Sequence, residues 1–168
     1  DRKCRSILHL IDEGVDTGPI LISQPYEFPE SCKVPADYYR YQIETDIPFM
    51  ADFLEKIKAG FDFTLEEQDP SQSTSWPRLH TPTHAAIDWR WSGLEVCRFI
   101  RAFDDPYSGA FTFCRGFKVQ LKQAEENSES FHPSQAGMVY RICGARIYAA
   151  CGEGSVSFEE DWSHRIHV

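Results

Sequence analysis

The 168-residue sequence has no long apolar run, no secretory leader and no metal-type cysteine spacing. None of its apolar stretches approaches the roughly 18 residues that a membrane-spanning helix needs, so no membrane association is predicted. The charged start lacks a long apolar segment before a small-residue cleavage site, which argues against secretion. The six cysteines include no Cys-x-x-Cys pair, so they predict free thiols in a reducing cytoplasm and no metal site.

Basic residues are also scarce. The chain has 17 Lys and Arg against 26 Asp and Glu, a formal net charge of −9. Residues 1–85 carry 8 basic and 15 acidic side chains, and residues 86–168 carry 9 and 11, which gives −7 and −2. Nucleic-acid affinity depends on cations that neutralise phosphates, so the charge argues against a nucleic-acid partner. A small anionic ligand needs only one or two local cations and remains compatible.

What the sequence does contain is an ordinary globular composition with one distinctive bend. Hydrophobic residues make up 42% and charged residues 26%, enough for one domain or two small ones. Apolar runs at 4–11 and 19–24 read as two strands. The bend between them has two glycines, which reach positive φ at low cost, and an aspartate between the glycines. That aspartate, Asp16, either faces a cleft as a catalytic group or caps the turn through nearby N–H groups.

The bend resembles the signature of the folate-dependent formyltransferases. Residues 9–21 read His-Leu-Ile-Asp-Glu-Gly-Val-Asp-Thr-Gly-Pro-Ile-Leu. The resemblance implies that Asp16 is a catalytic acid and that His9 lines the same cleft. It further implies that Gly14, Val15, Asp16 and Gly18 form the folate side of the loop.

Several phrases beyond the bend extend this resemblance over most of the chain. Residues 76–82 (Trp-Pro-Arg-Leu-His-Thr-Pro), 87–92 (Ile-Asp-Trp-Arg-Trp-Ser) and 100–111 (Ile-Arg-Ala-Phe-Asp-Asp-Pro-Tyr-Ser-Gly-Ala-Phe) look like the linker and opening helix of the family's C-terminal domain. Residues 149–154 (Ala-Ala-Cys-Gly-Glu-Gly) resemble a hairpin of its nucleotide-sugar enzymes. Their order and spacing make the resemblance specific.

One family element is not found in the sequence. In these enzymes a catalytic Asn-x-His element lies upstream of the aspartate loop, and no such element occurs here. His132-Pro133-Ser134 is a superficial match that we interpret as a loop. The resemblance therefore implies the C-terminal portion of a formyltransferase with one of three catalytic residues. The fold it implies is an α/β remnant of a doubly wound, Rossmann-like domain, followed by a small OB-like β-barrel.

Composition divides the chain into three parts. Residues 1–65 are expected to be the C-terminal part of the catalytic domain, 66–85 a linker, and 86–168 the OB-like domain. The linker is polar and contains three prolines. Within it, Arg78 is either a substrate-binding residue that faces the cleft or the domain interface, or an exposed linker arginine.

Element signals are clear in two regions. Residues 35–60 read as a helix that Pro48 should kink or divide. Its apolar residues are expected to be core: Tyr38, Tyr39, Ile43, Ile47, Met50, Phe53, Leu54 and Ile57. Ser92 and Glu95 form a capping box for a second helix that ends before Pro106. Five short strands are predicted after it, at 110–114, 117–121, 137–143, 146–151 and 155–158.

The function that the resemblance implies is formyl transfer from the co-substrate 10-formyltetrahydrofolate to a primary amine. The acidic charge and the Cys-Gly-Glu-Gly hairpin at 151–154 favour an amino sugar carried on a nucleotide as the small-molecule acceptor. A homodimer is compatible with the family. Methionyl-tRNA formyltransferase is the first alternative. A formyltetrahydrofolate hydrolase is disfavoured by the C-terminal domain, and a non-catalytic, truncated binding module is the last alternative.

Overall fold

The computed structural model describes residues 2–161, which divide into two compact units. The first unit holds the residues up to Cys32 together with Asp37–Pro77. The second holds Lys33–Ala36 and the described residues from Arg78 onward. The boundary after residue 77 falls inside the segment 66–85 expected to be a linker. Among the described residues, no helix has both the length and the apolarity that a membrane span needs.

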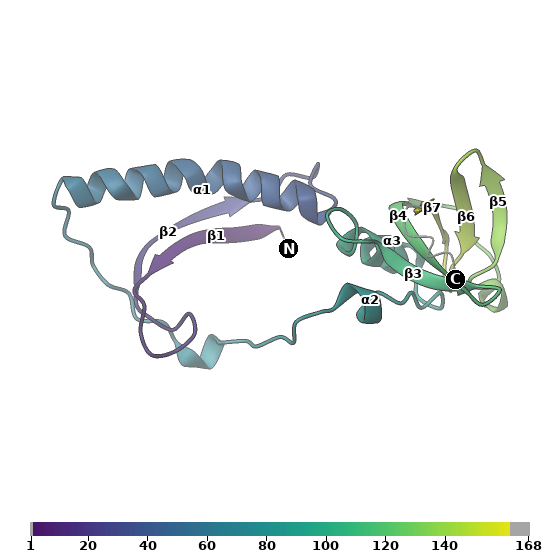
Figure 1. The fold of residues 1–168 in the computed structure, drawn as a ribbon, viewed down its shortest axis with the longest axis horizontal. Helices are drawn as coiled ribbons and strands as arrows, with labels where there is room; N and C mark the ends of the chain where they lie inside the picture. The colour runs from purple at the N-terminus through teal and green to yellow at the C-terminus, as the bar shows by residue number, and fades with distance from the viewer. Residues whose placement is uncertain (1, 162–168) are drawn as a thin grey trace. The chain divides into compact units, whose positions relative to one another are not determined.

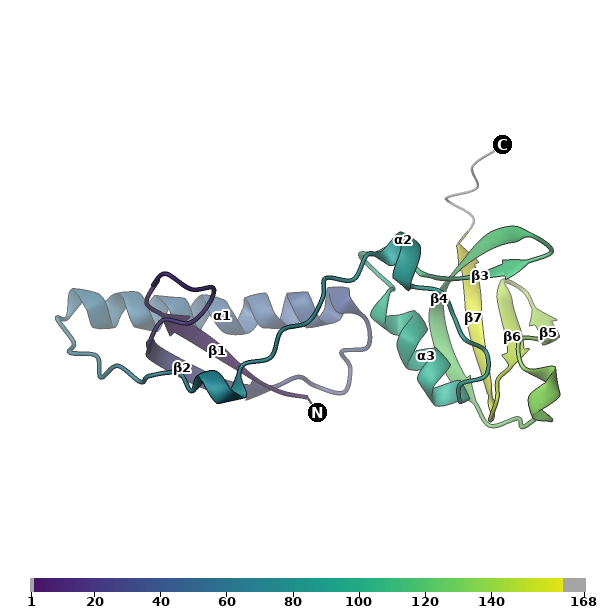
Figure 2. The ribbon, with the colours of Figure 1, turned by 90° about the horizontal axis from the view of Figure 1, so that it is seen from below.

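The first unit is a hairpin of two strands with one long helix along it (Figures 1 and 2). Strands β1 (Lys3–His9) and β2 (Ile20–Glu27) are antiparallel. Helix α1 (Pro35–Lys58) packs on one face of the hairpin through a cluster of aromatic rings from both elements. A short 3₁₀ helix, η1 (Pro70–Gln72), follows.

Helix α1 departs from the prediction in two ways. Pro48 does not divide it, because an exposed position lets water replace the one backbone hydrogen bond that proline removes. The predicted core role of the apolar residues is wrong for most of them. Six of them, here called the α1 stripe, are between 42% and 65% exposed in this structure: Tyr39, Ile43, Ile47, Met50, Leu54 and Ile57. The helix turns a different face toward the hairpin, where Phe49 is buried.

The second unit begins with α2 (Thr81–His84) and α3 (Gly93–Ala102) and continues as a five-stranded antiparallel sheet. The strands lie in the order β3 (Ala110–Cys114), β4 (Phe117–Asn127), β7 (Ser155–Asp161), β6 (Arg146–Ala150), β5 (Val139–Cys143). A 3₁₀ helix, η2 (Pro133–Gln135), precedes β5. All five predicted strands are confirmed, and the core lies between α3 and the sheet, around Val96, Ile100 and Leu121.

The strand pairing does not confirm the finer fold prediction. Every ladder in residues 2–161 is antiparallel, so the first unit shows no parallel, doubly wound sheet. The sheet of the second unit is open, so the OB-like barrel does not close over the described residues. One reason is that the outer edge of β3 is taken by the incoming chain. Phe111 exchanges backbone hydrogen bonds with Ala85 (2.8 Å) and Ile87 (2.9 Å), so part of that edge is already paired.

Candidate functional site

The candidate site is a solvent-open hollow in the first unit, beside β1 and α1. Its volume is about 440 Å³, within the size range of small-molecule sites. Both residues predicted to be catalytic, Asp16 and His9, line it. The other lining residues are Arg5, Ser6, Ile7, Leu8, Gln42, Asp46, Phe49, Met50 and Gln68.

Asp16 and His9 face each other across the mouth of the loop. Nε2 of His9 lies 3.6 Å from Oδ1 of Asp16, and the Asp16 side chain is 86% exposed. Nδ1 of His9 lies 2.8 Å from the backbone oxygen of Leu10. Because a carbonyl oxygen only accepts, this contact places the hydrogen of a neutral ring on Nδ1. Nε2 then becomes a donor toward Asp16 only in the imidazolium form, so the pair is electrostatic and depends on protonation of His9.

The loop backbone corrects the predicted role of its glycines. Neither Gly14 nor Gly18 has a positive φ; the residue in the left-handed region is Asp16 itself, at φ 57°. The glycines are needed for space instead. A Cβ on Gly18 would lie 1.8 Å from the backbone oxygen of Leu10, and one on Gly14 would lie 2.1 Å from Oγ1 of Thr17. The loop is therefore too tight for a side chain at Gly18, where the obstructing atom is backbone, whereas the Thr17 hydroxyl near Gly14 can rotate away.

The turn-capping role that was the alternative for Asp16 belongs to Asp12. Oδ1 of Asp12 accepts hydrogen bonds from Oγ1 of Thr17 (2.6 Å) and from the backbone N–H of Gly14 (3.1 Å). The hydrogen bond from Thr17 is the main cause that lowers the pKa of the Asp12 carboxyl. Sequence reasoning missed Asp12, although its Asp-x-Gly spacing is typical of a local turn. With the turn closed by Asp12, the carboxylate of Asp16 is left for other chemistry.

A second tether comes from the segment that follows α1. Nε2 of Gln68 donates to the backbone oxygens of Asp16 (3.0 Å) and Gly18 (2.6 Å). Glu66 and Ile20 exchange backbone hydrogen bonds of 2.8 and 3.0 Å. Sequence reasoning missed Gln68, because a contact across about fifty residues leaves no local pattern.

The floor of the hollow contains a polar link between the hairpin and the helix. Oγ of Ser6, which is buried, donates to Oδ1 of Asp46 on α1 at 2.5 Å. The link satisfies a carboxylate that would otherwise be costly to enclose. Asp46 is thus held by the scaffold rather than aimed at a ligand.

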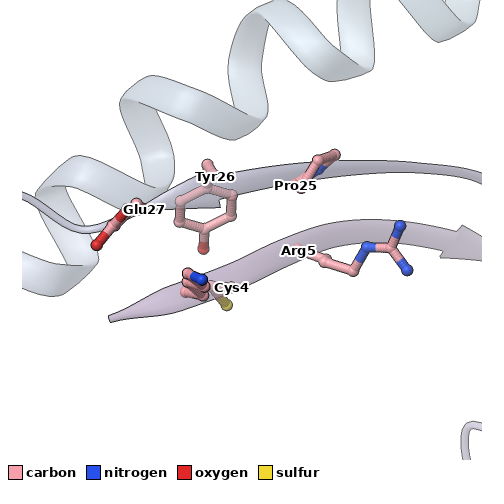
Figure 3. A pocket seen from close by; sticks show the side chains of 6 residues that line it. Cys4, Arg5, Pro25, Tyr26 and Glu27 are labelled. Atoms are coloured by element: carbon pink, nitrogen blue, oxygen red, sulfur yellow. The ribbon is translucent and has the colours of Figure 1, made fainter. Parts of the chain in front are cut away.

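A second hollow, of about 570 Å³, lies near the other end of the hairpin and carries no predicted site residue. Figure 3 shows Tyr26 of β2 over Cys4 of β1, with Arg5 and Glu27 beside them. Burial, and then the hydrogen bond with Cys4, raises the pKa of the Tyr26 phenol. The Tyr26 ring also packs edge-on against Phe28 at 5.1 Å. This arrangement is typical of packing under a sheet end.

The remaining predicted site residues are placed less directly. Val15 is 90% exposed beside Asp16, whereas Gly18 is buried and offers only its backbone. Arg78 is exposed and belongs to the second unit, so its substrate role stays a prediction. The interpretation of His132 as a loop residue is confirmed, because its Nδ1 accepts from the Ser134 N–H at 3.2 Å and caps η2.

The phrases of the second unit turn out to be packing partners of one another. The N–H of Gly152 lies 2.9 Å from the backbone oxygens of both Trp89 and Trp91, and a Cβ on Gly152 would meet the Arg90 oxygen at 1.9 Å. The N–H of Gly93 donates to the Glu153 oxygen at 2.7 Å. The Cys-Gly-Glu-Gly hairpin therefore docks on the turn before α3. Its glycines serve the fold and carry no information about the acceptor.

A buried acid explains the segment at 100–111 of this unit in structural terms. Asp104 is 2% exposed, and its carboxylate accepts from the N–H groups of Asp105 (2.8 Å) and Gln123 (2.7 Å). Gln123 has φ 53° and sits where the register of β4 shifts. Asp104 thus holds a bulge in the sheet, and the phrase at 100–111 is part of the scaffold.

Comparison with known proteins extends these observations. Residues 80–161 match the model of the formyl transferase C-terminal domain. A methionyl-tRNA formyltransferase from Acidobacterium capsulatum is 32% identical over 146 residues, which cover 86% of this chain and 44% of the relative. The chain spans about half the length of the curated relatives it matches.

Two solved structures share the fold at low identity. An N-formyltransferase from Helicobacter canadensis, in complex with folinic acid and dTDP-3-aminofucose, aligns with a TM-score of 0.70 at 14% identity. The alignment covers 96% of this chain and 57% of that one. HypX from Aquifex aeolicus, in complex with tetrahydrofolic acid, aligns with a TM-score of 0.69 at 20% identity, covering 94% and 27%. The family match and the curated relatives show that the chain belongs to the folate-dependent formyltransferase family, as its C-terminal part, and the two solved structures share its fold.

Proposed function

We propose that the protein transfers a formyl group from 10-formyltetrahydrofolate to the primary amine of an amino sugar carried on a nucleotide. The observation that carries the proposal is the Asp16 carboxylate, exposed beside His9 in an open hollow on a loop of the formyltransferase type. The amine nitrogen would attack the formyl carbon. The new C–N bond forms as the bond from that carbon to N10 of the folate breaks.

Asp16 would serve the proton transfers of this reaction. The attacking amine loses one proton, and N10 of the departing tetrahydrofolate gains one, so a carboxylate that reaches both atoms can relay it directly or through water. His9 in its imidazolium form would orient Asp16, because its Nε2 lies 3.6 Å from Oδ1 of that carboxylate. The apolar Val15 beside it is free to contact the folate ring. Donors for the tetrahedral oxyanion are implied by the family's Asn and His rather than by residues of this chain.

We further propose that the first unit works as part of a larger, Rossmann-like catalytic domain. The α1 stripe supports this, because a row of six large apolar side chains at helical spacing is typical of a face that packs against protein. Strand β1 supports it too, because among the described residues its one strand partner is β2, on one of its two edges.

The charge distribution supports a small anionic acceptor over tRNA. Four of the basic residues of the second unit are paired with its own carboxylates: Arg90, Lys122, Arg141 and Arg146. Such cations are poorly available to neutralise phosphates along a nucleic acid. The second candidate acceptor, initiator methionyl-tRNA, is favoured by one observation, the similarity to curated methionyl-tRNA formyltransferases.

We also propose a cytoplasmic location, because all six cysteines are unpaired.

The test is formyl transfer by the protein that carries this sequence, with 10-formyltetrahydrofolate and either dTDP-3-aminofucose or initiator methionyl-tRNA. We expect product with the sugar nucleotide, and a loss of roughly 10²- to 10⁴-fold in kcat for Asp16→Asn. Glu13→Gln is the matched control, because Glu13 is an exposed acid of the same loop that does not line the hollow. Transfer to the tRNA alone would move the acceptor to the second candidate. Unchanged turnover by Asp16→Asn would remove the assigned role.

A further inference from the structure

Gln68 joins the segment after α1 to the loop that carries Asp16, and no family phrase quoted above includes it. We infer that Gln68 is a positioning residue for Asp16 in the formyl transfer proposed above, on which this inference rests. It lines the same hollow as Asp16 and His9. Its two contacts with the loop are to backbone, so it acts on the position of the acid rather than on its charge.

The chemistry of the two contacts fixes how the amide is oriented. Both partners of Gln68 are carbonyl oxygens, which accept and cannot donate. The NH₂ group must therefore face the loop, with one hydrogen for Asp16 at 3.0 Å and the other for Gly18 at 2.6 Å. These carbonyls stand on either side of Thr17. One side chain thus fixes two peptide planes, Asp16–Thr17 and Gly18–Pro19.

This restraint acts where the backbone most needs one. Asp16 occupies the left-handed region at φ 57°, which a residue with a Cβ leaves readily unless its surroundings hold it. On the side before Asp16, the hydrogen bonds of Asp12 close the turn. On the side after it, Gln68 and the Glu66–Ile20 backbone pair tie the loop to the segment. Between these restraints the Asp16 carboxylate is aimed at the hollow.

The decisive variant is Gln68→Glu, which keeps the side-chain length and turns both donors into acceptors that face carbonyl oxygens. The chain offers a matched control four residues on. Gln72→Glu makes the same chemical and charge change in the same segment, where Nε2 of Gln72 contacts only Oδ2 of Asp69 at 3.2 Å. If Gln68→Glu fails to fold, the pair Gln68→Met and Gln72→Met removes the donors without adding charge.

The first readout needs no activity. We expect hydrogen exchange at the amides of residues 14–18 to accelerate by about tenfold or more in Gln68→Glu, and to stay at the wild-type rate in Gln72→Glu. Equal exchange in the two variants would contradict the role of Gln68 in holding the Asp16 loop. This comparison uses folded protein alone. It therefore still tests whether Gln68 holds the loop, even if no formyl transfer is detected and the proposed function fails.

The second readout separates positioning from a merely structural role. A misplaced catalytic group lowers the rate more than binding, so we expect kcat to fall roughly 10- to 100-fold in Gln68→Glu, with the KM for 10-formyltetrahydrofolate nearly unchanged. Adding Gln68→Glu to Asp16→Asn should cause no further loss, since there is then no acid to position. An equal loss in both backgrounds, or a kcat equal to that of Gln72→Glu, would contradict the inference.

Discussion

At the scale of single residues, the site depends on one strained aspartate and on the contacts that hold it. A left-handed conformation costs a residue with a Cβ about 1–2 kcal/mol. Hydrogen bonds of the kind that Gln68 makes contribute about 1 kcal/mol each, and less when partly exposed. The two quantities are similar, so the loop has little stability to spare. Small changes at its closing contacts should therefore loosen it.

Gly18→Ala tests how tightly the loop closes. The added methyl would overlap the backbone oxygen of Leu10, which cannot rotate away, so we expect a loss of about 1–3 kcal/mol in the stability of the first unit. Gly116→Ala is the comparison, because a Cβ there meets nothing within 4 Å, although its φ of 86° adds strain. Thermal unfolding followed by circular dichroism gives both values. A Gly18→Ala protein as stable as wild type would show that the loop can open to admit a side chain.

At this scale, whether the sequence predicts a contact depends on how far apart its two residues lie along the chain. The proximity of His9 and Asp16 is predictable, since both belong to one hairpin bend. Even there the backbone was misread, because the glycines supply space and Asp16 takes the positive φ. Gln68 is not predictable from pattern, because nothing local in a polar segment indicates which amide reaches back to the loop.

At the scale of elements, the sequence predicted helices and strands best where all the residues that define a signal lie close together in the chain. The capping box of α3 is confirmed: Ser92 accepts from the Glu95 N–H at 3.2 Å, and Glu95 accepts from the Ser92 N–H at 2.9 Å. The strands of the second unit are confirmed because glycine turns separate them. The α1 stripe was misassigned because periodicity reports an apolar face and does not say what covers it.

Ser92→Ala should lower the stability of the second unit by about 1 kcal/mol, because α3 loses the side-chain oxygen that accepts from the Glu95 N–H, while the backbone N–H of residue 92 keeps its contact with the Glu95 carboxylate. The same backbone contact lowers the pKa of the Glu95 carboxyl, so Glu95→Gln is expected to cause a smaller loss in the same direction. Denaturant unfolding of the two variants measures both changes. Ser130→Ala, at an exposed serine of the same unit, is the control. Equal midpoints for Ser92→Ala and Ser130→Ala would mean that the cap is dispensable.

At the scale of the whole molecule, the two units are unequally packed. The second unit holds a continuous core of thirteen buried residues. In the first unit the buried apolar side chains are Cys32 and Phe49 among the described residues. The fold class was therefore predicted better for the second unit, whose core is local to it. The first unit, expected to be a remnant of a doubly wound domain, consists of an antiparallel hairpin and α1 among the described residues, and this pairing does not identify the parent fold.

Acid should destabilise both units. Hydrogen bonds lower the pKa of Asp12 and Asp69 in the first unit, and the Arg90 hydrogen bond lowers the pKa of Asp88 in the second to about 2. A carboxyl with a lowered pKa contributes stability that is complete above its usual value of 3.8 and is lost as the pH falls toward its value in the folded state. We expect the unfolding temperature to fall between about pH 4 and pH 2, by a small amount because these groups are exposed.

Asp88→Asn is the matched variant, since it keeps the shape and removes the titration. Its unfolding temperature should depend less on pH over that interval than that of the wild type. Identical profiles would assign the acid sensitivity to other carboxyls.

The thin packing of the first unit, which carries the Asp16 loop, has a practical consequence for any test of the proposed function. We expect mild warming to unfold the first unit and to abolish the proposed formyl transfer while the core of the second unit stays folded. A sample whose second unit is still folded would then have no activity. A negative assay is therefore informative only when the folding of the first unit is measured separately.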